Sequence, residues 1–302
     1  EFPFAYNVMK DAFSDRVDGG LRRCTETNSC PKIIHSVSGS EYWQERASLN
    51  TTDALGKQDL VLPDNVRFYF LASTQHGPAR PGTHNPLAKH PSNPNPQADS
   101  MRALLVAFDG WIRTGAPPPP SMHPRLSDGT LVMPDRASTG FPKIPGVTYN
   151  GVMNELPVLD FGPEFLTKGI VTNHPPKQVE GQWWRPLVPK VDADGNDIAG
   201  IRSVQILAPI GTYTGWNLRS KAAGAENELY DLQGSFSPFE RTKAARIAKG
   251  DPRPSLEERY GTHAGYVTKV RAAAADLTAK GLLLQEDAER IIKEAEASDI
   301  LR

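Results

Sequence analysis

The chain has 302 residues, a formal net charge of -1 and 38% hydrophobic residues, which is enough for one large domain or two smaller ones. The nearly balanced charge gives no electrostatic footprint for nucleic acid or a membrane surface. No apolar run approaches the ~20 residues that span a bilayer. With 27 prolines and 25 glycines, the sequence predicts a loop-rich protein with many fixed turns.

The first thirty residues read as a loop and a short helix near residues 18–27. Cys24 and Cys30, the only cysteines, lie close enough for a short-loop disulfide, which would indicate a periplasmic or secreted protein. Two reduced thiols in a cytosolic protein are the alternative. Because the spacing matches no zinc pattern and no second pair exists, we expect no metal site there.

Two short apolar runs follow, residues 33–37 and 66–73, and each ends in a turn signal. Near-continuous apolar runs are typical of strands covered on both faces in a parallel sheet. Next, Asn95 and Pro96 predict the start of a helix that ends at Gly115 and the prolines of 117–120. One apolar stripe runs along this helix: Met101, Leu104, Leu105, Phe108, Trp111 and Ile112.

The expected secondary structure of the remaining chain changes at two points. Residues 121–240 hold short β-like runs, and Asp194-Gly195 predicts a hairpin turn between two of them. From 241 onward the chain is expected to be helical, with Thr262 capping a helix that closes at Gly281 and a second helix over about 285–298. We therefore divide the chain into residues 1–120, 121–240 and 241–302.

Glu41 and His76 each lie a few residues beyond the carboxyl end of an expected strand. Ligands of open α/β sheets bind at that end of the strands, so the two side chains are candidates for adjacency. A carboxylate beside a histidine fixes its tautomer and stabilises the imidazolium, which suits a general base. Asp53 remains an alternative acid, whereas Asp64 precedes the second strand and lies at the wrong end of the sheet.

Other polar and aromatic groups have simpler interpretations. His84 and His90 lie in a proline-rich loop with no acid or cysteine cluster, which favours a solvated loop or access rim over a metal site. The run Asp192–Asp197 lacks the glycine and glutamate of a calcium loop, so the hairpin is favoured. The remaining tryptophans would either pack in the β-rich segment or line an aromatic pocket: Trp183, Trp184 and Trp216.

Four passages resemble the C-terminal half of a bacterial group of α/β-hydrolase-domain proteins: CPKIIHSVSGSEYW, LPDNVRFYFLASTQHGP, MRALLVAFDGWIRTGAPPPP and GDPRPSLEERYG. The resemblance implies an α/β fold of which this chain holds the last two parallel strands and final helix, with a β-rich extension and a helical tail. It also implies ester hydrolysis by a serine nucleophile, with Glu41 as acid, His76 as base and no cofactor. Trp43, two residues past Glu41, is expected at the wall of the site.

One part of that pattern is missing, because the sequence contains no G-x-S-x-G motif. Its closest string, Ser36–Ser40, lies on the strand assigned to the acid and cannot also be the elbow. We therefore expect the serine upstream of Glu1, on a tightly bound N-terminal chain or on a preceding segment of a longer protein. The expected function is the C-terminal portion of a serine carboxylic ester hydrolase acting on a small-molecule ester. The alternative is a non-catalytic binding module on a hydrolase-like scaffold.

Overall fold

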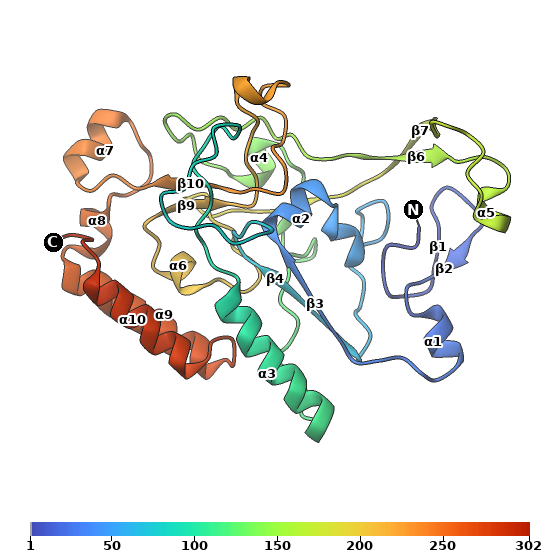
Figure 1. Cartoon of the computed structure of the whole chain (residues 1–302), viewed down its shortest axis with the longest axis horizontal. Helices are drawn as coiled ribbons and strands as arrows, with labels where there is room; N and C mark the ends of the chain where they lie inside the picture. Colours follow the sequence, from blue (N-terminus) through green and yellow to red (C-terminus); the bar gives the residue numbers. More distant parts are fainter. Residues whose placement is uncertain (1) are drawn as a thin grey trace.

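The computed structural model describes residues 2–302, and Figure 1 shows their arrangement. Two adjacent strands form its parallel pair, β3 (Ile33–Ser38) and β4 (Val66–Leu71), in a register from Ile33 beside Val66 to Ser38 beside Leu71. On its other side β4 meets Met122 and Ile201 in isolated parallel bridges. Both expected strands are thus present, and their carboxyl ends lie together. The fold is of the α/β class.

Shorter elements surround this pair. The strands of the four antiparallel ladders are β1 (Met9–Lys10) with β2 (Val17–Asp18), β5 (Leu131–Val132) with β8 (Val188–Pro189), β6 (Leu156–Asp160) with β7 (Lys177–Trp184), and β9 (Gly211–Thr214) with β10 (Ser235–Pro238). The helices are α1 (Arg22–Glu26), α2 (Gly39–Gln44), α3 (Ala98–Thr114), α4 (Arg136–Thr139), α5 (Phe165–Lys168), α6 (Val204–Leu207), α7 (Lys243–Lys249), α8 (Leu256–Tyr260), α9 (His263–Ala279) and α10 (Gln285–Ala297), with short 3-10 turns at Ala47–Asn50 and Lys221–Ala223. The β6–β7 arm extends away from the core beside the N-terminal segment (Figure 1).

Alternate residues of β4 feed two different cores, because successive side chains of a strand point to opposite faces. Tyr69 and Leu71 join a cluster with residues of α6, α9 and α10. Phe68 and Phe70 join a second cluster with Val37, Trp43, Leu131, Phe141, Val188 and Trp216. All three segments of the sequence therefore contribute to shared cores, and residues of the C-terminal helices pack beside Tyr69 and Leu71 of β4.

The signals for a helix cap, a helix end and a turn predicted the local structure correctly. The side chain of Thr262 accepts a hydrogen bond from the N–H of Gly265 at 3.1 Å and caps α9. Gly115 ends α3 in the left-handed conformation at φ +78°. The turn at Gly195 is also present, with φ +82° and an N–H donated to Asp192 at 2.9 Å, although only a single bridge, Val191 to Asp197, flanks it.

The expected start of α3 was wrong. Asn95 does not cap the helix; Gln97 precedes its first residue and makes no side-chain cap. The Asn95 amide instead donates to the carbonyl of Ala72 at 3.1 Å and of Ser73 at 3.0 Å. Buried carbonyls at the end of β4 need donors, and this demand outweighs the local capping preference.

The apolar stripe of α3 is only half covered. Leu104 and Trp111 are buried, but Met101, Leu105 and Ile112 are 44%, 66% and 58% exposed.

Within residues 2–302, no helix is long and apolar enough to cross a membrane.

Candidate active site

Glu41 is held in place by the way β3 turns into α2. Ser38, the last residue of the strand, is also the N-cap of the helix, and its Oγ accepts from the N–H of Ser40 at 3.2 Å. The Glu41 carboxylate reaches back and accepts from the N–H of Ser38 at 2.6 Å through Oε2. This reciprocal capping box follows from the sequence pattern Ser-x-x-Glu. It fixes the carboxylate at the carboxyl end of β3 and leaves Oε1 free.

His76 forms a hydrogen bond with that free oxygen. Its Nδ1 lies 2.5 Å from Oε1 of Glu41, with the Glu41 side chain 15% exposed and the His76 side chain 55% exposed. The hydrogen bond to Glu41 raises the pKa of His76 above its ordinary value, and the desolvation of the ring opposes this only in part. Nε2 makes no hydrogen bond to any of residues 2–302. The ring is therefore oriented by a carboxylate through one nitrogen and open through the other.

The main chain of His76 is tied to the same helix. Its N–H lies 3.2 Å from Oγ of Ser40 and 3.2 Å from the carbonyl of Leu232. The Ser40 hydroxyl in turn lies 2.7 Å from the carbonyl of Gly215. Both Ser40 and Gly215 are therefore support for the pair, and sequence reasoning missed both of them. Of the residues that support the pair, only Ser38 could have been identified from the sequence, through the Ser-x-x-Glu spacing of the capping box.

The alternative acids do not reach His76. Asp53 closes its own loop, accepting from the N–H of Lys57 at 2.6 Å and of Gln58 at 2.8 Å. Asp64 lies just before β4, at the opposite end of the strand from His76. Glu41 is thus the carboxylate that the fold brings to the imidazole.

Trp43 lies in the core. It is 5% exposed, and its ring centroid lies 6.1 Å from that of Tyr149 and 5.9 Å from that of Trp216. Residues two apart on a helix point about 200° from each other, so Trp43 faces away from the side that carries Glu41. Trp184 and Trp216 are buried as well, in keeping with a packing role.

The other polar candidates are local. Asp192 accepts from the N–H groups of Asp194 and Asn196, both at 3.0 Å, as the hairpin interpretation requires. Nε2 of His84 lies 3.1 Å from the carbonyl oxygen of Ala88, whereas His90, expected in a solvated loop or access rim, is buried. In the part of the chain that the structure describes, no group of three or more histidine, cysteine, aspartate or glutamate side chains could hold a metal ion.

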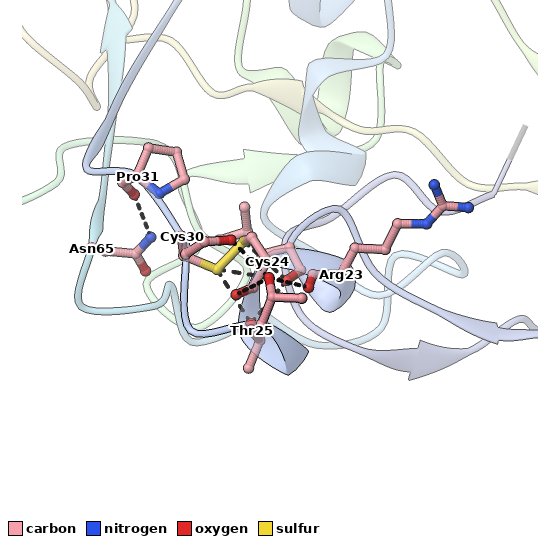
Figure 2. The surroundings of a disulfide bond; sticks show 9 residues. Arg23, Cys24, Thr25, Cys30, Pro31 and Asn65 are labelled. Carbon is pink, nitrogen blue, oxygen red and sulfur yellow. Dashed lines mark hydrogen bonds between the residues drawn. A yellow bond between two sulfur atoms is a disulfide. The ribbon is translucent and has the colours of Figure 1, made fainter.

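The two cysteines form the expected disulfide (Figure 2). It joins α1 to the segment that leads into β3, and Pro31 beside it accepts a hydrogen bond from the Asn65 amide at 2.7 Å. Asn65 immediately precedes β4. The disulfide therefore lies at the amino end of the parallel pair, away from His76.

No curated protein and no solved structure matches the chain. The family model described as "Alpha/beta hydrolase domain" matches residues 4–293, nearly the whole length. By that match, this chain belongs to the alpha/beta hydrolase domain family.

Proposed function

We propose that this chain supplies the acid, Glu41, and the base, His76, of a serine-dependent carboxylic ester hydrolase. The observation that carries the proposal is the 2.5 Å contact between Glu41 and Nδ1 of a ring that is otherwise exposed. A histidine held this way can take a proton at Nε2 while its carboxylate partner stabilises the resulting imidazolium. The membership of the hydrolase family supports a hydrolytic reaction.

In the proposed reaction, a serine Oγ attacks the acyl carbon of a small-molecule ester as Nε2 of His76 accepts the hydroxyl proton. The imidazolium then gives this proton to the departing alcohol, which leaves an acyl-enzyme. Water attacks the acyl-enzyme by the same route in reverse and releases the acid. Glu41 orients the ring throughout, and the reaction needs no cofactor.

We place the serine outside residues 1–302, on an N-terminal chain or segment. The edge of β3 supports such a partner. The N–H of Phe70 in β4 donates to the carbonyl of Met122 at 2.8 Å, on the side away from β3. Successive residues of a strand direct their main-chain groups to opposite sides, so the neighbours of Phe70 bond toward β3. In a parallel ladder, a residue of β3 that lies opposite a β4 residue bonding toward β3 has its own main-chain groups on the outer edge, and Ile34 and Ser36 are in this position. Within residues 2–302, β3 pairs only with β4, so these groups have no strand partner there.

The exposed half of the α3 stripe supports the same partner. Met101, Leu105 and Ile112 follow one another at helical spacing on one face and are all exposed. An unpaired strand edge and an apolar helix face are both surfaces that proteins normally cover. The Cys24–Cys30 disulfide suits an oxidising compartment, so we propose a periplasmic or secreted location.

The test combines mass spectrometry with a covalent probe. Intact mass and peptide mapping of purified protein should find a co-purifying segment that contains G-x-S-x-G, and a serine-directed fluorophosphonate should label that segment. Labelling should fall sharply in His76→Ala and less in Glu41→Gln, and stay unchanged in the control His84→Ala, which alters an exposed loop histidine. A homogeneous, stably folded monomer of this chain alone that resists the probe would contradict the proposal and favour a non-catalytic binding module.

A further inference from the structure

The loop between β4 and His76 contains a strained residue. Ser73 has φ +54°, in the left-handed region that non-glycine residues seldom adopt. Such a conformation is energetically unfavourable and persists only where the surroundings impose it. Ser73 is fully buried. Protein groups, rather than water, must therefore hold it.

Asp197 is the main restraint on Ser73. The N–H of Ser73 donates to Oδ2 of Asp197 at 2.6 Å, and the N–H of Asp197 donates to Oγ of Ser73 at 2.7 Å. The two residues are 124 positions apart, so this reciprocal pair joins the 191–197 hairpin to the end of β4. Asp197 is 6% exposed and takes no part in the Glu41–His76 contact.

Hydrogen bonds to the carbonyls of Ser73 and Thr74 extend this restraint along the loop toward His76. The carbonyl of Ser73 accepts from the side-chain amide of Asn93 at 2.8 Å. The carbonyl of Thr74 accepts from the N–H of Gly39 at 3.0 Å, and Gly39 is the first residue of the helix that carries Glu41. A change in the orientation of Ser73 would therefore shift His76 relative to Glu41.

We propose that Asp197 is a positioning residue for His76, acting through Ser73. Its side-chain oxygen fixes Ser73 in the left-handed conformation and so keeps the imidazole against Glu41. The inference concerns this contact, and only its value for hydrolysis rests on the proposed function.

The need is for a hydrogen-bond acceptor rather than for a charge. Burial raises the pKa of Asp197 to about 7, although the hydrogen bonds from Ser73 oppose this. Asp192 raises this pKa further and Arg202 lowers it, and the Tyr42 hydroxyl that faces Asp197 is also buried. A neutral acid still offers its carbonyl oxygen to the N–H of Ser73. Asparagine should therefore replace Asp197 in this role, whereas alanine should not.

The test reads His76 directly, by NMR titration of labelled imidazoles in the full chain with any partner that co-purifies. His76→Ala assigns the signal, and Glu41→Gln defines the pKa of His76 without its carboxylate partner. Asp197→Ala should lower the His76 pKa by most of the drop seen in Glu41→Gln. Asp197→Asn should leave it near the wild-type value, which also controls for the loss of the charge. A folded Asp197→Ala variant with the wild-type pKa would overturn the proposal, as would an equal drop in Asp197→Asn.

A second variant guards against a failure to fold. Ser73→Gly removes the conformational cost, because glycine adopts positive φ freely. Ser73→Gly also removes the Oγ that accepts from the N–H of residue 197, so the double variant Ser73→Gly/Asp197→Ala is compared with Ser73→Gly alone, and its His76 pKa should stay close to that of the single variant. If the double variant is no better than Asp197→Ala in either respect, Asp197 does not act through Ser73 and the proposal is wrong. Probe labelling plays no part in this readout, so a failure of the proposed function would leave the result unaffected.

Discussion

Gly39 and Gly215 approach so closely that neither position has room for a side chain. A Cβ on Gly215 would lie 2.3 Å from the carbonyl carbon of Gly39, and a Cβ on Gly39 would lie 2.8 Å from Cα of Gly215. This contact seats the start of α2 against the chain segment whose carbonyl receives the Ser40 hydroxyl. The position of Glu41 thus depends on a main-chain contact between Gly39 and Gly215, which lie 176 positions apart in the sequence.

Gly215→Ala should therefore destabilise the protein. The new methyl group would collide with main-chain atoms that cannot move aside cheaply, which predicts a loss of about 1–3 kcal/mol or more in the free energy of unfolding. Urea titration followed by fluorescence measures this loss. Gly110→Ala is the control: it adds a methyl group in open space on α3 and should stabilise the helix by about 0.5–1 kcal/mol. Equal behaviour of the two variants would refute the close-contact argument.

The Glu41–His76 contact predicts a specific dependence of stability on pH. The pKa of His76 is raised in the folded chain, so the pair contributes its full stability below the unfolded pKa of about 6.5 and loses it as pH rises through the folded pKa. Glu41→Gln keeps an oxygen for the N–H of Ser38 but removes the charge. The unfolding free energies of wild type and Glu41→Gln should therefore differ more near pH 6 than near pH 9.

The matched control for that prediction is the same substitution in a His76→Ala background. There the difference between glutamate and glutamine at position 41 should no longer change with pH over this range. A pH-dependent difference that survives the loss of His76 would show that another group is responsible.

Removing one partner of the buried Arg253–Asp251 pair should destabilise the protein strongly. Both side chains are 1% exposed, and Arg253 also donates to Oγ1 of Thr212 at 2.7 Å and to the carbonyl of Ser237 at 2.9 Å. Arg253→Ala leaves a buried carboxylate without its partner, which costs about 3–5 kcal/mol. Arg113→Ala, on the exposed pair with Asp109, should change stability by no more than about 0.5 kcal/mol in the same urea titration. A small effect of Arg253→Ala would indicate that water reaches Asp251.

The disulfide should contribute modestly, because it closes a short loop. The sequence separation is 6 residues, for which chain entropy predicts about 2 kcal/mol. The double variant Cys24→Ser/Cys30→Ser should lose about that much, measured by urea unfolding. Wild-type protein treated with dithiothreitol should fall to the same stability, while the double variant should not respond to the reductant. A reductant effect on the double variant would point away from this bond.

The exposed stripe of α3 should matter for a partner and not for the fold. Leu105 is 66% exposed, so Leu105→Glu should change the unfolding free energy by no more than about 0.5 kcal/mol. The same charge should reduce recovery of the proposed N-terminal partner in a pull-down. Val61→Glu is the control, since Val61 is 84% exposed and lies before β4 at the far end of the sheet from His76. Undiminished partner recovery with Leu105→Glu would exclude this face as the contact.

Sequence reasoning was most successful where a signal was local. Both strands of the parallel pair followed from short apolar runs that end in turn residues, and Thr262 and Gly115 ended their helices as their types require. It was wrong at Asn95, where a buried carbonyl from another part of the chain took the side chain that local preference assigned to a cap. It could not show which half of the α3 stripe is covered, since the periodicity is equally apolar on both halves.

By itself, the sequence determined that an acid and a histidine follow the ends of two neighbouring strands. These features depend on spacing within a few residues. Only the tertiary structure decided that Glu41 rather than Asp53 meets His76, and that Asp197 and Gly215 support the pair. The contacts of Asp197 and Gly215 join positions more than a hundred residues apart, and all of these contacts depend on the path of the main chain, which the identities of the neighbouring residues do not specify.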